Sequence, residues 1–314
     1  YHLQRGDTKR TKVIVPDSAH GTNPASASVC GMDTIVVPST PEGTVDITAL
    51  KKVLNDEVAG IMLTNPNTLG IFEKDICEIA ELVHANGSLL YYDGANLNAL
   101  LGIARPGDMG FDIMHINLHK TFSTPHGGGG PGSGPVGVTK ALVHLLPNPR
   151  VIKEKGKYRW LTNEQSIGSV SGFYGNFLVV VRAYTYLRTL GKENVHHVGY
   201  LSVLNANYIK ESLKEYYKLP ITGLCKHEVV FDGLISEKAT TLDVAKRLLD
   251  YGYHPPTIYF PLLFHQTIMI EPTEVESKET IDDFINTMIK IAQEAEANPD
   301  LLKTAPHNTI VRRL

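Results

Sequence analysis

Lys120 is the residue whose neighbours in the sequence most clearly suggest chemistry. In the segment that precedes it, 112–119, apolar residues alternate with polar ones. This alternation predicts a strand with one polar face and with Lys120 at its end. A glycine-rich stretch, 127–134, follows shortly, and backbone without side chains can approach a phosphate closely. This combination suits a lysine that holds pyridoxal phosphate as a Schiff base, although most lysines are simply exposed and a glycine-rich stretch can be an ordinary loop.

A metal site at the same place is disfavoured by spacing. His115 and His119 share the polar face but lie four residues apart on the predicted strand. At ~3.3 Å per residue their separation is ~13 Å, too far for one ion. We therefore expect no metal at this pair.

The glycine-rich stretch also satisfies the GxGxxG pattern of dinucleotide-binding proteins, with Gly127, Gly129 and Gly132. That pattern requires a helix to begin at the glycines. Pro131 falls where the helix should run, and residues 136–138 have the composition of a strand. The sequence therefore argues against a nicotinamide or flavin dinucleotide.

A pyridoxal cofactor needs a carboxylate at its ring nitrogen, and Asp93 is the candidate. An ionised carboxylate there keeps the ring protonated and able to accept electrons. Asp93 directly follows an apolar strand predicted over 88–92. From its position alone, an ordinary loop or helix-cap aspartate is an equally good interpretation.

The elements that must position these residues follow from periodicity. Strands are predicted at 13–15, 34–37, 60–63, 88–92 and 136–138, with helices at 25–31 (Asn23 as N-cap), 47–54 and from 76 to about 86. This β-α-β order predicts a mostly parallel, doubly wound sheet. Further on, helices are predicted at 173–190, 195–217, 240–251 and 281–297, and strands at 228–231 and 267–270. They predict a smaller α+β domain.

Composition excludes several classes of protein. The 314 residues carry a net charge of -3, which argues against binding to nucleic acid or to a membrane surface. No apolar run reaches the ~18 residues of a membrane helix, and the start of the chain does not resemble a signal peptide. The three cysteines form no CxxC pair, which favours a reducing intracellular compartment. The absence of an initial Met suggests a fragment.

Taken together, the motifs resemble the glycine decarboxylase family, the P-proteins of the glycine cleavage system. The strongest match is the cofactor-lysine segment, Asn117-Leu118-His119-Lys120-Thr121-Phe122 with Pro125-His126 and the glycine run. Other parts of the family's pattern match at 18–27, 92–96, 166–168, 173–177 and 254–257. The resemblance is ordered along nearly the whole chain, and it is to the C-terminal portion of the subunit 2 type.

The resemblance implies a fold and a division of the chain. The fold is the α/β fold of pyridoxal-phosphate transferases, the aspartate-aminotransferase type (fold type I), with a mostly parallel sheet and a smaller C-terminal α+β domain. Residues 1–165 would be the remainder of the large cofactor domain, 166–194 a connecting helix, and 195–314 the small domain.

The resemblance also implies an activity, glycine dehydrogenase (aminomethyl-transferring). Such an enzyme uses pyridoxal 5'-phosphate to decarboxylate glycine and passes the aminomethyl group to the lipoyl arm of the H-protein. An N-terminal half or subunit 1 and a homo- or hetero-oligomer are expected, in the bacterial cytoplasm or, in a eukaryote, the mitochondrion. The alternatives are another amino-acid decarboxylase or lyase of fold type I, or a fragment inactive without its N-terminal half.

Site residues carried over from the family start with Lys120 as the covalent attachment point. Asp93 would pair with the ring nitrogen, and Ala95 would lie against one ring face. The other residues implied to contact cofactor or substrate are His20, Thr22, Asn23, Asn65 and His119. The family's phosphate-binding glycine segment and its ring-stacking residue are expected upstream of Tyr1.

Overall fold

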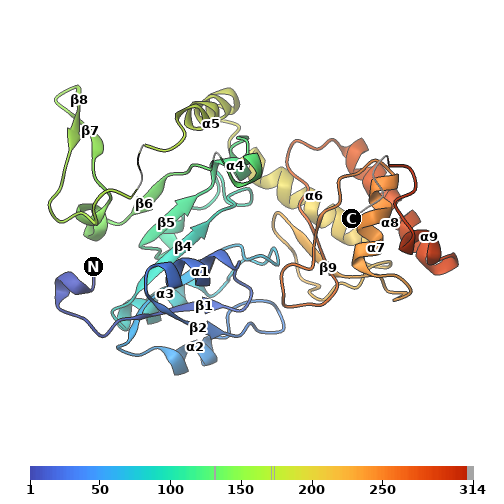
Figure 1. Cartoon of the computed structure of the whole chain (residues 1–314), viewed down its shortest axis with the longest axis horizontal. Helices are drawn as coiled ribbons and strands as arrows, with labels where there is room; N and C mark the ends of the chain where they lie inside the picture. Colours follow the sequence, from blue (N-terminus) through green and yellow to red (C-terminus); the bar gives the residue numbers. More distant parts are fainter. Residues whose placement is uncertain (131, 171, 173, 310–314) are drawn as a thin grey trace.

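The structure, a computed structural model, describes residues 1–130, 132–170, 172 and 174–309, and its largest element is a six-stranded sheet (Figure 1). The strand order is β2-β1-β3-β4-β5-β6. All neighbours are parallel except β6, which runs antiparallel to β5. The bounds are β1 Lys12–Pro16, β2 Asp33–Val37, β3 Val58–Thr64, β4 Leu89–Gly94, β5 Ile113–Ile116 and β6 Val136–Val138. The predicted mostly parallel α/β fold is confirmed.

Helices lie on both faces of this sheet because the strands are apolar on both sides. On one face, residues such as Leu63 and Leu90 pack with the helices α2 and α3 in the main core. On the other face, Val13 and Val15 pack against Ala27 of α1 in a small separate cluster. The helix bounds are α1 Thr22–Val29, α2 Ile47–Val53 and α3 Ile76–Ala85.

A second sheet with its own core forms the C-terminal part of the chain (Figure 1). Its strand order is β10-β11-β9, all antiparallel. The bounds are α6 His197–Leu213, β9 Val229–Asp232, α7 Thr241–Asp250, β10 Thr257–Ile258, β11 Thr267–Ile270, α8 Lys278–Ala297 and α9 Asp300–Lys303. Thr240 and Asp243 have the sequence spacing of a capping box, and the box is present at the start of α7. The Thr240 side chain accepts from the N–H of Asp243, and the Asp243 carboxylate accepts from the N–H of Thr240. The boundaries 1–165, 166–194 and 195–314 stay a prediction.

Between the two sheets the chain forms a hairpin and a long helix. The hairpin, β7 Arg150–Glu154 with β8 Lys157–Leu161, was not predicted. The long helix, α5 Phe177–Leu190, was predicted to begin at residue 173, which lies outside the described residues. Short 3-10 helices complete the fold: η1 Leu3–Arg5, η2 Pro106–Met109, η3 Gly127–Gly129 and η4 Lys140–Leu145. In the described part of the chain, no helix is both long and apolar enough to cross a membrane.

Two predicted elements differ from the structure near the site. The strand predicted to reach Lys120 ends at Ile116, and Asn117 opens the one-turn helix α4, Leu118–Thr121. The apolar–polar alternation of the sequence extends to Leu118 because the helical turn also buries this side chain. Helix α1 begins at Thr22 with Gly21 as its N-cap, so Asn23 is a buried residue of the first turn rather than the cap.

Candidate functional site

Helix α4 holds Lys120 at the end of β5. The turn is anchored by the N–H of Leu118, which donates to the Ser133 carbonyl at 3.1 Å, and by Thr121, whose hydroxyl accepts from the N–H of Leu97 at 2.8 Å. Leu118 and Thr121 are buried, whereas Lys120 is exposed. The turn therefore fixes the backbone in the core and leaves the Lys120 amine accessible.

The glycine-rich stretch packs against the same strand end. A Cβ on Gly134 would lie 1.6 Å from the carbonyl oxygen of Ile116, so only glycine fits there. The neighbouring carbonyl of Gly132 accepts from the Asn176 side chain at 3.0 Å. These contacts place the stretch directly beside α4, as the sequence predicts, and only the 3-10 turn η3 forms within 127–130.

Asp93 is the next-to-last residue of β4, the strand beside β5, and it is buried, with 5% of its surface exposed. Its Oδ1 accepts from the N–H of Ala95 at 3.0 Å. The same oxygen lies 3.4 Å from Nε2 of His115. Among the described residues, no hydrogen bond reaches Oδ2. One carboxylate oxygen is therefore held by the protein, and the other is free to accept.

His115 and Tyr91 surround Asp93, and sequence reasoning missed this role for both. His115 lies directly opposite Asp93 in the β4–β5 register, and Tyr91 precedes Asp93 by two residues on the same face. The Tyr91 hydroxyl and Nδ1 of His115 are 2.7 Å apart. Burial lowers the pKa of His115, and the Lys120 ammonium lowers it further against the opposing effect of Asp93.

The small domain contributes two carboxyl groups that the sequence did not reveal. In the β9–β11 register Val229 lies opposite Ile270, so the adjacent Glu228 and Glu271 meet at the same end of the sheet. Burial raises the pKa of Glu228 well above its usual range, and the nearby Glu271 adds to this effect. The positive charge of Lys120 acts on both carboxyls in the opposite direction. The pair therefore lies close enough to Lys120 for the charges to interact.

Contacts between the small domain and the loops of the large sheet hold the small domain in place. Asn96, three residues after Asp93, donates to Oε1 of Glu271 at 2.6 Å, and Asn98 donates to the same atom at 3.3 Å. Gly70 has φ +72, and a Cβ on it would lie 2.1 Å from the Glu228 carbonyl oxygen. The backbones of Gly70 and Glu228 can approach this closely because glycine has no side chain.

The predicted residues of the 20–23 segment lie at the start of α1. The N–H and hydroxyl of Thr22 approach Nδ1 of His20 at 3.1 and 2.8 Å. The His20 ring packs edge-on against Phe260 of the small domain, with centroids 5.3 Å apart. Asn23 is 1% exposed, and its amide nitrogen has no partner. This segment thus lies at the contact between the two parts of the chain.

Asn65 and His119 have different surroundings. Asn65 is fully buried, and its carbonyl oxygen accepts from the N–H of Glu73 at 2.9 Å. That amide therefore supports a loop, and the predicted contact of Asn65 with a cofactor stays a prediction that this geometry does not favour. His119 is half-buried beside Lys120, and its Nδ1 is buried with no hydrogen-bond partner. Its pKa is lowered by burial first and then by His126 and Lys120.

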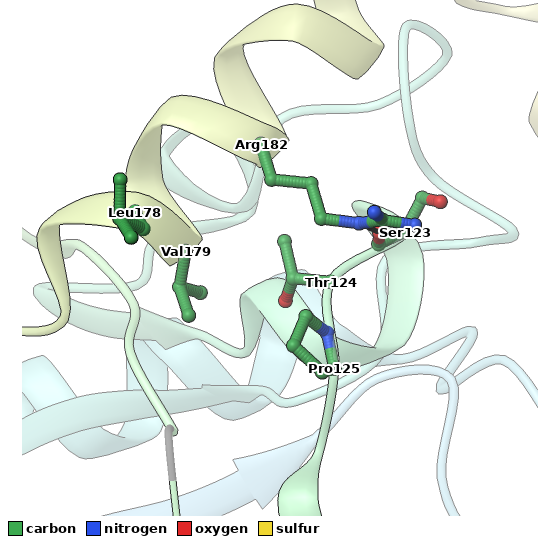
Figure 2. Close-up of a pocket in the computed structure, with 6 residues that line it drawn as sticks. All are labelled: Ser123, Thr124, Pro125, Leu178, Val179 and Arg182. Carbon is green, nitrogen blue, oxygen red and sulfur yellow. Dashed lines mark hydrogen bonds between the residues drawn. The ribbon is translucent and has the colours of Figure 1, made fainter.

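The residues that follow α4 line a hollow of about 560 Å³ (Figure 2). Figure 2 shows Arg182 reaching from α5 over Ser123, and its Nε donates to the Ser123 carbonyl at 2.5 Å. Leu178 and Val179, from the first turn of the same helix, are apolar lining residues of this hollow. In the described part of the chain, no group of three His, Cys, Asp or Glu side chains is placed to hold a metal ion.

His227 makes the stability of the folded chain sensitive to acid. Its side chain is 3% exposed, and burial lowers its pKa from 6.5 to about 4. As the pH falls below 6.5, the unfolded chain binds a proton at this residue before the native chain does. The free energy of unfolding should therefore decrease between pH 6.5 and 4, by roughly 3 kcal/mol at this residue.

We expect His227→Gln to remove this part of the pH dependence. Urea unfolding of the wild-type chain and of the variant, from pH 7 to pH 4.5, measures it. His144→Gln is the matched control, because His144 makes an exposed contact with Gln4 instead of being buried. Equal slopes of stability against pH in wild type and His227→Gln would contradict the assignment.

Comparison with known proteins adds the family. Residues 4–167 match the glycine cleavage system P-protein family, and residues 198–312 match the C-terminal domain of glycine dehydrogenase. The whole chain is 63% identical to a probable glycine dehydrogenase (decarboxylating) subunit 2 of Caldanaerobacter subterraneus subsp. tengcongensis and 60% identical to one of Alkaliphilus oremlandii. The chain spans 65% of the length of each of these relatives.

Solved structures show the same fold at low sequence identity. A glycine decarboxylase (P-protein) of the glycine cleavage system, in inhibitor-bound form, is 22% identical with a TM-score of 0.77, over 92% of this chain and 67% of that one. A glutamate decarboxylase of Lactobacillus brevis is 13% identical with a TM-score of 0.70, over 94% and 69%. The fold is therefore that of these decarboxylases, and on the family match over residues 4–167 the chain belongs to the glycine cleavage system P-protein family.

Proposed function

We propose that this chain is the cofactor-lysine-bearing part of a glycine decarboxylase. The enzyme would release carbon dioxide from glycine and pass the aminomethyl group to the lipoyl arm of an H-protein. The observation that carries the proposal is that two residues lie at the carboxyl ends of neighbouring strands in a chain of the P-protein family. They are the buried Asp93, within the last two residues of β4, and Lys120, in the turn that follows β5. Open α/β sheets bind their ligands at this edge.

Pyridoxal 5'-phosphate is the cofactor that these groups fit. Bound there, it supplies an electron sink for the pair left behind when the carboxyl group departs. The Lys120 amine is accessible for covalent attachment, and Oδ2 of Asp93 is free to accept a ring N–H. The buried Nδ1 of His119 lacks a partner, so it could bind a phosphate oxygen when protonated.

The surrounding residues would orient the substrate. Asp93 would hold a proton on the ring nitrogen. Ala95 donates its N–H to that carboxylate, and its small side chain leaves room for a ring. His20, Thr22 and Asn23 lie where the small domain meets the sheet, and the unpartnered Asn23 amide can donate to a carboxylate. Such contacts would hold the bond to the departing carboxyl group perpendicular to the ring.

Glu228 and Glu271 favour glycine over larger acidic amino acids. Both lie near Lys120, and the pKa of Glu228 is raised first by burial and then by the nearby Glu271. A substrate with a side-chain carboxylate would bring a further negative charge close to Glu228 and Glu271. Glycine brings no side chain and avoids the repulsion.

The proposed partners are glycine, a lipoylated H-protein and a polypeptide that supplies the part of the relatives' length that this chain does not span. The relatives are named as subunit 2 and are longer than this chain, so we propose assembly with a subunit 1 into a larger oligomer. The near-balanced charge gives no reason to add nucleic acid or membrane as a partner. We place the enzyme in the cytoplasm.

Exchange of carbon between glycine and bicarbonate tests the proposed function. The chain, completed by the missing part of its relatives and supplied with cofactor and lipoylated H-protein, should incorporate labelled bicarbonate into the carboxyl group of glycine. Omission of the carrier should lower the exchange strongly. No exchange, or carrier-independent release of carbon dioxide from glutamate instead, would overturn the proposal in favour of another decarboxylase.

A further inference from the structure

Three side chains on one face of β4 and β5 form a chain that ends at Asp93. The Tyr91 hydroxyl and Nδ1 of His115 are 2.7 Å apart and share a hydrogen bond. The other ring nitrogen of His115 lies 3.4 Å from Oδ1 of Asp93. Tyr91 and Asp93 are two residues apart on one strand, and His115 stands opposite Asp93 on the next, so the backbone register builds this arrangement.

The direction of the contacts follows from where protons can reside. His115 is half-buried and its pKa is lowered, so the ring is neutral at neutral pH and carries one proton. A carboxylate repels a ring lone pair and attracts an N–H, which places that proton on Nε2. Nδ1 must then accept, and Tyr91 donates to it. Burial raises the pKa of Tyr91 to about 12, so the phenol keeps its proton.

We propose that Tyr91 and His115 are positioning residues that select one histidine tautomer and direct its N–H at Asp93. With Oδ1 held by this N–H and by the backbone of Ala95, the free oxygen Oδ2 is the one presented to a cofactor ring. This inference rests on the proposed function, in which Asp93 holds the ring proton.

The cofactor-free chain gives the first test, because the tautomer exists without any ligand. Long-range proton–nitrogen NMR should show the proton of His115 on Nε2. Tyr91→Phe removes the donor to Nδ1, and the pKa of His115 should then rise by about one unit, because Nδ1 becomes free to take a proton. Asp93, Lys120 and Tyr91 are the ionisable groups around this ring. A proton on Nδ1, or an unchanged pKa in Tyr91→Phe, would overturn the inference.

The second test asks whether the chain of contacts acts on the cofactor. In the completed enzyme, His115→Leu should weaken binding of pyridoxal phosphate by about 10-fold and shift the pH titration of its visible absorption. His115→Gln, which keeps an N–H donor, should recover part of the loss. His144→Gln is the histidine control, and thermal melting checks that each variant is folded.

The outcomes separate this inference from the proposed function. A completed wild-type enzyme that takes up no cofactor overturns both. Wild-type uptake, with His115→Leu unchanged in affinity and in the pH titration, overturns the inference alone. If His115→Leu loses binding and His115→Gln does not recover any of it, a donor at Asp93 is not what His115 supplies, and the inference is again overturned.

Discussion

Lys120→Ala is expected to abolish covalent cofactor attachment and to lower glycine–bicarbonate exchange by about 10³-fold or more. The amine of Lys120 is accessible at the end of α4, while Glu228 and Glu271 of the small domain lie near it. Alanine keeps the helical turn, since Leu118 and Thr121 anchor it to the core. The loss would therefore come from the missing amine rather than from misfolding.

Borohydride reduction followed by peptide mapping measures this prediction directly. Wild-type enzyme completed by its missing part should carry one reduced adduct, on Lys120. Lys140→Ala is the control, because Lys140 is exposed and lies outside the site. An adduct on another lysine, or exchange that survives in Lys120→Ala, would show that the attachment point has been assigned to the wrong residue.

The sequence located the lysine better than it described the lysine's surroundings. Period-two alternation extended the strand to residue 120, yet the strand ends at Ile116 and a helical turn follows. Both conformations bury Leu118, so the apolar pattern could not distinguish them. The ~13 Å separation estimated for His115 and His119 assumed the same strand, so it does not apply to His119 in α4.

Elements that have clear capping residues or a clear apolar periodicity were predicted well from the sequence. Strand β11 matches its predicted bounds, and the capping box of Thr240 and Asp243 is formed as its spacing indicated. The hairpin of β7 and β8 was missed because most of its side chains are exposed, so no apolar pattern marks it. The exposure of the hairpin is a property of the folded chain, and the sequence does not display it.

The meeting of Glu228 with Glu271 could not be predicted from their spacing in the sequence. Glu228 and Glu271 are far apart in sequence and meet only because β9 and β11 pair antiparallel in one register. Each looks like an ordinary charged residue at the end of a strand. The same holds for His115, whose relation to Asp93 depends on the register of β4 with β5. Long-range pairing thus creates the electrostatics of the site.

Asp93→Asn is expected to lower the exchange rate by about 10²- to 10³-fold while the chain stays folded. Asparagine has nearly the same shape as aspartate. Its single oxygen can keep the N–H of Ala95 and the N–H expected on His115 as donors. The amide NH₂ then takes the place of Oδ2 and points a donor at the ring nitrogen. A ring nitrogen that accepts from an amide is unprotonated, so the ring loses its capacity to accept electrons.

The same substitution separates charge from shape. Cofactor uptake in Asp93→Asn should weaken far less than exchange does, because Lys120 still supplies the covalent bond. Asp108→Asn is the matched control, because Asp108 forms an exposed ion pair with Arg105. If Asp93→Asn exchanges carbon at the wild-type rate, the ring proton must be held by another group. Asp93 would then be a buried end-of-strand carboxylate that stabilises the 93–95 turn, and His115 with Tyr91 would support the fold rather than the reaction.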